Sequence, residues 1–213
     1  MRKMKFGILL VLAVLALVSV ASAALPALVT AHIATPGTAT HSYWDVDVTT
    51  GGGDIPAVND YVGWCSDSQT YITQGTHTFN VYSSLLPALL PSDLPTAQWG
   101  KINYVINHKG TANAATIQAL IWYYDGGIIP WGTVEVAKFN ALKADAEANP
   151  LYVPGPGDIY AVILWNPTTE AQPLFIEIPI PTTPSPEFPT LALPVAMLIG
   201  VVGAVQYVRT RKE

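Results

Sequence analysis

Apolar positions in the middle of the chain predict strands at both ends of one domain. In the segment 43–49, Trp44, Val46 and Val48 alternate with polar residues, a pattern typical of a half-buried strand. Apolar segments bounded by turn residues predict further strands at 60–66, 77–84, 159–165 and 174–180. The last two are expected to form a closing pair, joined by the loop 166–173.

Apolar residues at helical spacing predict three helices between these strands. They are Trp99–Ile106, Ala114–Trp122 with its end at Gly126-Gly127, and Val136–Leu142, entered at Thr133 and stopped at Asn149-Pro150. Strands, then helices, then strands favour an α+β fold.

Both ends of the chain carry targeting patterns. Residues 1–23 combine a basic start, an apolar run and a small-residue cleavage triplet, which is typical of a secretory signal peptide. Residues 188–208 are uncharged over a length that spans a bilayer, and a basic cluster follows at once. We therefore expect a cell-surface protein with an external domain at 24–180, a Pro-rich stalk and sorting motif at 181–187, and a transmembrane helix with a cytoplasmic tip at 188–213.

The charge of the expected external domain argues against a nucleic-acid partner. Between residues 24 and 180, four lysines face thirteen Asp and Glu residues. Binding to nucleic acid needs a basic patch, which this sequence lacks. The acidity is instead expected to keep an extracellular domain soluble.

Cys65 is the only cysteine of the chain. Exported proteins normally carry cysteines in pairs, so a lone thiol needs a separate explanation. It is an inert buried side chain, half of an intermolecular disulfide, or a reactive group. A zinc site would need more ligands, and no histidine lies in a recognisable hydrolase motif, so neither a metal nor a cofactor is expected.

Gln118 is a polar residue on the apolar face of the second predicted helix. A buried carboxamide without partners costs about 1–3 kcal/mol, so its atoms need hydrogen bonds. Periodicity alone favours a bond to the backbone. A second possibility is a reaction with Cys65, whose thiolate would displace ammonia and form an intramolecular thioester.

The residues around Cys65 and Gln118 resemble the thioester domains of bacterial surface adhesins. Trp64-Cys65-Ser66-Asp67 is similar to the Cys-x-Asp pattern of that family, and Gln118 precedes Trp122 by four residues, as in the family's glutamine motif. Segments 99–110 and 172–181 are similar to a helix and to the closing strand, so the resemblance spans 43–181. The departures from the pattern, which leave the reactive pair intact, are Ser66, Ile117 and Leu120.

This resemblance implies a β-rich, sandwich- or barrel-like core with a packed helical subdomain, and a binding function rather than an enzymatic one. An amine on an extracellular target would attack a Cys65–Gln118 thioester and leave the protein attached through an amide. The alternative is a structural cell-envelope or surface-layer accessory protein in which Cys65 is inert or forms an intermolecular disulfide.

Supporting roles are expected for five further residues. Trp64 and Trp122 are candidates to keep the bond dry, and Asp67 either caps a turn or accepts a hydrogen bond beside it. His77 and His108 are candidate proton carriers.

The segment Pro186-Glu187-Phe188, with the apolar span and basic tip behind it, resembles the PEF-CTERM sorting signal of archaeal surface proteins. That resemblance implies an archaeosortase-type processing enzyme as a partner, removal of the span, and attachment to a lipid.

Overall fold

The computed structural model describes residues 25–35, 42–58, 60–92, 94, 97–129, 131–167 and 171–182. Residues Ala23–Ile180 form one structural unit, which is the subject of this section. The predicted signal peptide, the motif Pro186-Glu187-Phe188 and the predicted membrane span lie outside the described residues. No helix in the described part of the chain is both long enough and apolar enough to cross a bilayer.

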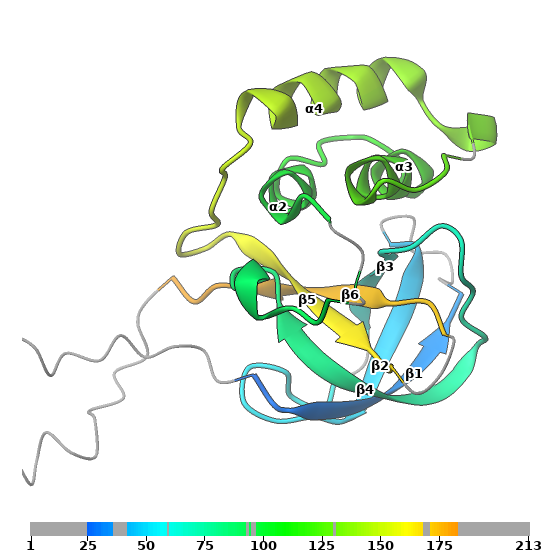
Figure 1. Ribbon diagram of the computed structural model, residues 1–213, viewed down its shortest axis with the longest axis vertical. Helices are drawn as coiled ribbons and strands as arrows, with labels where there is room; N and C mark the ends of the chain where they lie inside the picture. Colours follow the sequence, from blue (N-terminus) through cyan, green and yellow to red (C-terminus); the bar gives the residue numbers. More distant parts are fainter. Residues whose placement is uncertain are drawn as a thin grey trace, which may run out of the picture. The chain divides into compact units, whose positions relative to one another are not determined.

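Antiparallel strands close into a barrel in the order β1-β2-β3-β6-β5-β4 (Figure 1). Strands β1 and β4 pair with each other and complete the closure. The bounds are β1 Leu28–Ala34, β2 Trp44–Thr50, β3 Tyr61–Cys65, β4 Gly75–Ser83, β5 Ile159–Trp165 and β6 Leu174–Pro179.

Three helices form a layer over one side of the barrel. Helix α2 (Trp99–Asn107) contacts β5, and α3 (Ala114–Asp125) contacts β3. Helix α4 (Val136–Ala148) packs on α2 and α3, on their far side from the barrel (Figure 1). Two short 3-10 turns, η1 (Pro87–Leu89) and η2 (Trp131–Thr133), lie in the connections.

The apolar residues form two cores, because β3, β5 and β6 are buried on both faces. Successive side chains of a strand point to opposite faces. Trp64 and Phe175 therefore face the helices, whereas Cys65 and Leu174 face the barrel interior. This double burial explains why β5 and β6 are continuous apolar runs.

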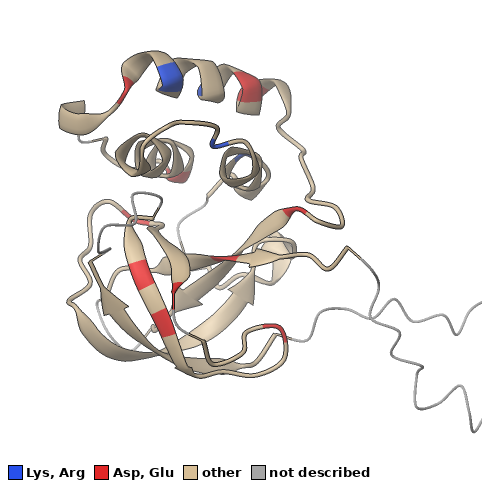
Figure 2. Ribbon diagram, turned by 180° about the vertical axis from the view of Figure 1, so that it is seen from behind, with Lys and Arg blue, Asp and Glu red and all other residues tan. Residues whose placement is uncertain are grey.

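Basic and acidic residues are distributed differently between the barrel and the helical layer. The four described lysines lie on the helices or directly after one, whereas acidic residues lie on both the barrel and the helical layer (Figure 2). Asp45 and Asp47 alternate along β2 with the buried residues Val46 and Val48. The described lysines do not form a patch suited to a phosphate backbone.

The structure confirms the α+β prediction with a barrel-like core and a packed helical subdomain. The strand expected at 159–165 has those bounds, and α3 ends at Gly126, whose φ of 81° suits glycine. Strand β1 was not predicted, although Val29, Ala31 and Ile33 alternate with more exposed residues.

The predicted entry of the third helix at Thr133 is wrong. Thr133 belongs to η2, and Glu135 is the N-cap residue of α4. Tertiary contacts decide this start, because the Glu135 N–H donates to Thr116 Oγ1 and the Glu135 carboxylate accepts from the Asn113 N–H.

Candidate functional site

The register between β3 and β6 sets the position of the candidate site. Cys65 lies opposite Leu174, and beyond this pair the Ser66 N–H donates to the Pro173 carbonyl at 3.0 Å. Residues two apart on a strand share a face. Gln172 therefore lies on the interior face beside Leu174, diagonally across from Cys65, within reach of a long side chain.

The thiol of Cys65 is buried and contacts two side chains. It donates to Gln172 Oε1 at 3.1 Å, and it accepts from Trp44 Nε1 at 3.0 Å. Cys65 is 2% exposed and Gln172 is 5% exposed. Burial raises the pKa of the Cys65 thiol to about 12, against the lowering effect of the hydrogen bonds from Trp44 and to Gln172.

Gln118 holds the backbone of Cys65. Its Oε1 accepts from the Cys65 N–H at 2.9 Å, and its Nε2 donates to the Cys65 carbonyl at 2.8 Å. Gln118 is fully buried, so these bonds satisfy a carboxamide that would otherwise be costly. Gln118 therefore forms hydrogen bonds to the backbone, as the helical periodicity of the sequence favoured.

The carboxamides of two glutamines, Gln118 and Gln172, contact different parts of Cys65. The prediction paired the thiol with Gln118, but the hydrogen bonds of that carboxamide go to main-chain atoms. The carboxamide that receives the hydrogen bond of the thiol belongs to Gln172. The structure thus places two buried carboxamides at Cys65, with Gln118 on its main chain and Gln172 on its sulfur, and the predicted Cys65–Gln118 bond stays a prediction.

Helix α3 is fixed at both ends, which holds Gln118 in place. At its start, Asn113 Oδ1 accepts from the Thr116 N–H at 2.8 Å. At its end, Gly126 adopts the left-handed conformation and its N–H donates to carbonyls of the last turn. The helix contacts β3 directly, so the Gln118 side chain can span the interface.

The two tryptophans proposed to keep the bond dry have different positions. Trp64 is fully buried but faces the helical layer, where its Nε1 donates to Glu177 Oε1 at 2.7 Å. It therefore does not cover the thiol. Trp122 belongs to the same apolar cluster as Cys65 and packs edge-on against Tyr43, with ring centroids 5.5 Å apart.

Neither histidine makes its hydrogen bonds at the thiol. His77 Nε2 donates to the Thr73 carbonyl at 2.8 Å. His108 Nδ1 donates to the Tyr104 carbonyl at 2.8 Å, and its ring stacks on Tyr104 with centroids 3.9 Å apart. The structure thus assigns both rings to local contacts, and the expectation of proton carriers gains no support from them.

Asp67 caps the turn that follows β3, as one of its two predicted roles required. Its Oδ1 accepts from the Gln69 N–H and its Oδ2 from the Thr70 hydroxyl, both at 2.7 Å. Among the described residues, no group of three or more His, Cys, Asp or Glu side chains is placed to hold a metal ion.

Sequence reasoning missed Gln172 and the role of Trp44. The segment that begins with Gln172 was matched to a closing strand, while the glutamine itself was not singled out. The sequence offered one indication of its importance, because Gln172 is a polar residue just before the apolar strand predicted at 174–180. Trp44 was identified as an inward-facing strand residue, but its indole N–H reaches the sulfur across 21 residues of sequence.

Comparisons with known proteins give structural neighbours but no sequence family. No protein-family model and no curated protein sequence matches the chain. The N-terminal domain of the Streptococcus pyogenes pilus tip adhesin Cpa is 15% identical, with a TM-score of 0.46 over 75% of this chain and 100% of that one. The N-terminal thioester domain of the fibronectin-binding protein SfbI from Streptococcus pyogenes is 13% identical, with a TM-score of 0.42 over 73% and 94% of the two chains. Because both identities are low, the roles of individual residues are argued from the contacts of this chain.

Proposed function

We propose that this protein is a surface-displayed adhesin whose external domain forms an internal thioester between Cys65 and Gln172 and bonds covalently to amines on an extracellular target. One observation carries the proposal: the buried thiol at the end of β3 donates to the buried carboxamide of Gln172, just before β6, at 3.1 Å. Positioned reactants of this kind lower the barrier to an intramolecular reaction.

Thioester formation needs no external reagent. The sulfur of Cys65 attacks the carboxamide carbon of Gln172, the C–N bond breaks, and ammonia leaves with the thiol proton. Gln118 supports this step by fixing the main chain of Cys65 on both sides, which limits the positions open to the sulfur.

The bond would be persistent until an amine reaches it. Cys65 is 2% exposed, and this burial would limit the access of water to an acyl–sulfur bond. When an amine attacks the acyl carbon, the C–S bond breaks and the sulfur regains a proton. The Trp44 N–H, already 3.0 Å from the sulfur, would stabilise the departing thiolate.

Burial of Cys65 also bears on the alternative function. An intermolecular disulfide requires an accessible sulfur, whereas Cys65 is 2% exposed and lies in the barrel core. The remaining alternative is a structural envelope protein with an inert thiol, and it predicts a different mass.

Intact mass spectrometry tests the proposal. We expect the mature protein to be lighter than its sequence by one ammonia, and Cys65→Ala and Gln172→Ala to have full mass. Full mass in the wild type, together with a Cys65 thiol that is freely alkylated after unfolding, would refute the thioester and leave the inert-thiol alternative.

Methylamine distinguishes the two glutamines. It opens a thioester by converting the acyl residue into its N-methylamide, which peptide mapping locates. We expect the label on Gln172. A label on Gln118 would restore the original pairing and assign Gln172 a supporting role.

Surface display is part of the same proposal and rests on the sequence. The pattern at 1–23 would direct export, and Pro186-Glu187-Phe188 before the apolar span would direct an archaeosortase-type enzyme. The mature protein from the native host is then expected to lack residues 191–213. Recovery of those residues in the mature protein would favour a plain membrane anchor.

A further inference from the structure

Two loops at one end of the barrel expose apolar side chains. One is the loop 84–92, which contains η1, and the other is the loop 149–158, which leads from α4 into β5. Their exposed apolar residues are Leu85, Leu86, Leu89, Leu151 and Val153. Exposed apolar side chains that gather in one region mark a surface that binds another phase or molecule.

Strand pairing brings the two loops to the same end of the barrel (Figure 1). Ser84, directly after β4, donates its N–H to the Ala161 carbonyl of β5 at 3.1 Å. The loop 149–158 runs directly into β5, which begins at Ile159. Both loops therefore lie at the start of β5, although about 60 residues separate them in the sequence.

Buried residues fix the loop 84–92 on both sides. Ser84 is buried, and its Oγ donates to Asn103 Oδ1 at 3.2 Å. Leu94 is also buried and belongs to the apolar cluster on the helical side of the barrel. Between them the Leu90 N–H donates to the Pro87 carbonyl and closes η1. The exposed leucines are therefore held at the surface by a turn that is attached to the core at both ends.

These loops carry almost no charge. The loop 84–92 has no charged residue, and Asp158 is the one charged residue of 149–158. The Asp158 carboxylate accepts from the Tyr152 hydroxyl at 2.7 Å, so it belongs to the turn before β5. The acidic residues of the separate connection between β2 and β3 are Asp54 and Asp60. An uncharged, leucine-rich surface favours contact with hydrocarbon.

The chain leaves the barrel beside the same loops. Ile180, directly after β6, donates its N–H to the Asp158 carbonyl at 2.7 Å and accepts from the Gly157 N–H at 2.9 Å. The residues 181–187 alone separate this exit from the apolar segment 188–208. A Pro-rich chain rises about 3.1 Å per residue, so this stalk reaches about 22 Å. Such a short tether would keep the apolar loops close to the membrane that holds the segment 188–208.

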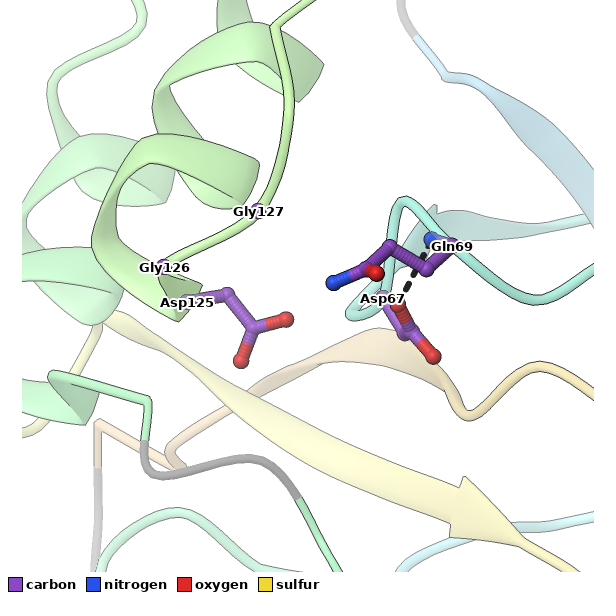
Figure 3. A pocket seen from close by; sticks show the side chains of 5 residues that line it. All are labelled: Asp67, Gln69, Asp125, Gly126 and Gly127. Carbon is purple, nitrogen blue, oxygen red and sulfur yellow. Dashed lines mark hydrogen bonds between the residues drawn. The ribbon is translucent and has the colours of Figure 1, made fainter.

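The opposite end of the barrel is polar. Strand β6 runs from Leu174, beside the thiol, to Pro179 at the exit, a rise of roughly 17 Å. At the Cys65 end, the turn after β3 and the end of α3 border a pocket of about 310 Å³ (Figure 3). Its lining consists of Asp67, Gln69, Asp125, Gly126 and Gly127. The end of the barrel that carries the candidate site is thus suited to water, and the end at which the chain leaves is suited to lipid.

We propose that the loops 84–92 and 149–158 dock on the lipid bilayer that anchors the chain, and that this contact turns the Cys65 end of the barrel away from the membrane. The exposed leucines enter the outer leaflet, while the stalk holds the exit of the chain at its surface. The inference rests on the surface display in the proposed function and is independent of the thioester. A second copy of the chain is the competing occupant of this surface.

Quenching by labelled lipids tests the docking on the full chain reconstituted in phosphatidylcholine vesicles. An environment-sensitive fluorophore is attached to Leu89→Cys, since Leu89 is 71% exposed whereas the native thiol is buried. We expect lipids with spin labels in their acyl chains to reduce its fluorescence about twofold or more. The control is Tyr71→Cys, at an exposed position whose carbonyl accepts from the Gln172 N–H at the Cys65 end. Its fluorescence should not respond to the labelled lipids.

Leu86→Asp gives a second readout. A carboxylate in the loop opposes entry into hydrocarbon, so the quenching of the Leu89→Cys probe should fall about threefold or more, whereas Tyr71→Asp should leave it unchanged. In the vesicle-bound chain, equal quenching of the Leu89→Cys and Tyr71→Cys probes would overturn this inference alone.

Two further outcomes would also overturn the docking. A Leu89→Cys probe that is shielded from water but not quenched by lipid, with a signal that depends on protein concentration, would identify a second copy as the occupant. A chain that does not bind the vesicles would refute the membrane anchor of the proposed function together with this inference. The thioester is judged separately, by the loss of ammonia in the intact mass.

Discussion

The carboxamide of Gln118 forms two hydrogen bonds to the main chain of Cys65, one to its N–H and one to its carbonyl, across the interface between α3 and β3. The pair lies 53 residues apart in sequence and is fully enclosed. It joins the end of β3, and with it the residue that carries the sulfur, to α3.

Replacing Gln118 should destabilise the domain strongly. Gln118→Leu keeps the size of the side chain but leaves a buried N–H and a buried carbonyl without partners, which we expect to cost about 2–4 kcal/mol in the free energy of unfolding. Urea unfolding measures this difference. Gln69→Leu, at an exposed position, should change it by less than about 0.5 kcal/mol. Equal stabilities of the two variants would contradict the positioning role.

Opening the thioester should lower the melting temperature. A Cys65–Gln172 bond joins residues 107 positions apart, and in the chain-entropy model such a loop contributes about 4–5 kcal/mol. We expect methylamine to lower the melting temperature of the wild type by several degrees, followed by circular dichroism. Cys65→Ser should melt near the opened protein and should not respond to methylamine; a response of equal size in that variant would argue against the bond.

Trp44→Phe should slow the opening of the thioester. The substitution keeps an aromatic ring but removes the N–H that lies 3.0 Å from the sulfur, so the departing thiolate loses a hydrogen bond. A lost hydrogen bond to a charged group corresponds to roughly a tenfold slower reaction with methylamine, measured by mass against time. Trp131→Phe, at a position 52% exposed, serves as control. An unchanged rate in Trp44→Phe would exclude this role.

The ion pair between Lys109 and Glu177 should contribute to stability on the helical side of the barrel. Lys109 Nζ lies 2.7 Å from Glu177 Oε2, and Trp64 Nε1 donates to the same carboxylate. Lys109→Met leaves this enclosed carboxylate without its cation, and we expect a loss of about 2–3 kcal/mol in urea unfolding. Lys143→Met, whose partner Glu147 lies 3.6 Å away at the surface, should cost less than about 1 kcal/mol. Similar losses in the two variants would show that the Lys109–Glu177 pair contributes no more to the free energy of unfolding than the surface pair does.

Asp125 should make stability depend on pH. Its folded-state pKa is raised from 3.8 to about 7, so between these values the folded state binds the proton more tightly and stability falls as pH rises. Asp125→Asn lacks this titration. Relative to wild type, the variant should therefore gain stability as pH rises from 3.8 to about 7 and show a constant advantage above that range. Urea unfolding of both proteins across this range measures the difference, and a difference independent of pH would disprove the raised pKa.

The sequence by itself determined most of the secondary structure and the face of each strand. Alternation in 44–50 and continuous apolar runs in 159–165 and 174–179 specify burial, because side chains on a strand alternate between two faces. The periodicity of α3 correctly predicted that Gln118 is buried and needs a partner. These features depend on residues close together in the chain, which is why a single sequence reveals them.

Only the tertiary structure decided which groups meet. Alternation along each strand decides which side chains share a face with Cys65 or with Leu174. The pairing of β3 with β6 and its register result from closure of the whole barrel. That register, set by contacts more than 100 residues apart, brings Gln172 rather than Gln118 to the sulfur. Trp44 lies 21 residues before Cys65, and no local pattern connects its indole N–H to the sulfur. The sequence thus determined that a thiol and a carboxamide are buried, and the packing of strands and helices determined which carboxamide the thiol faces.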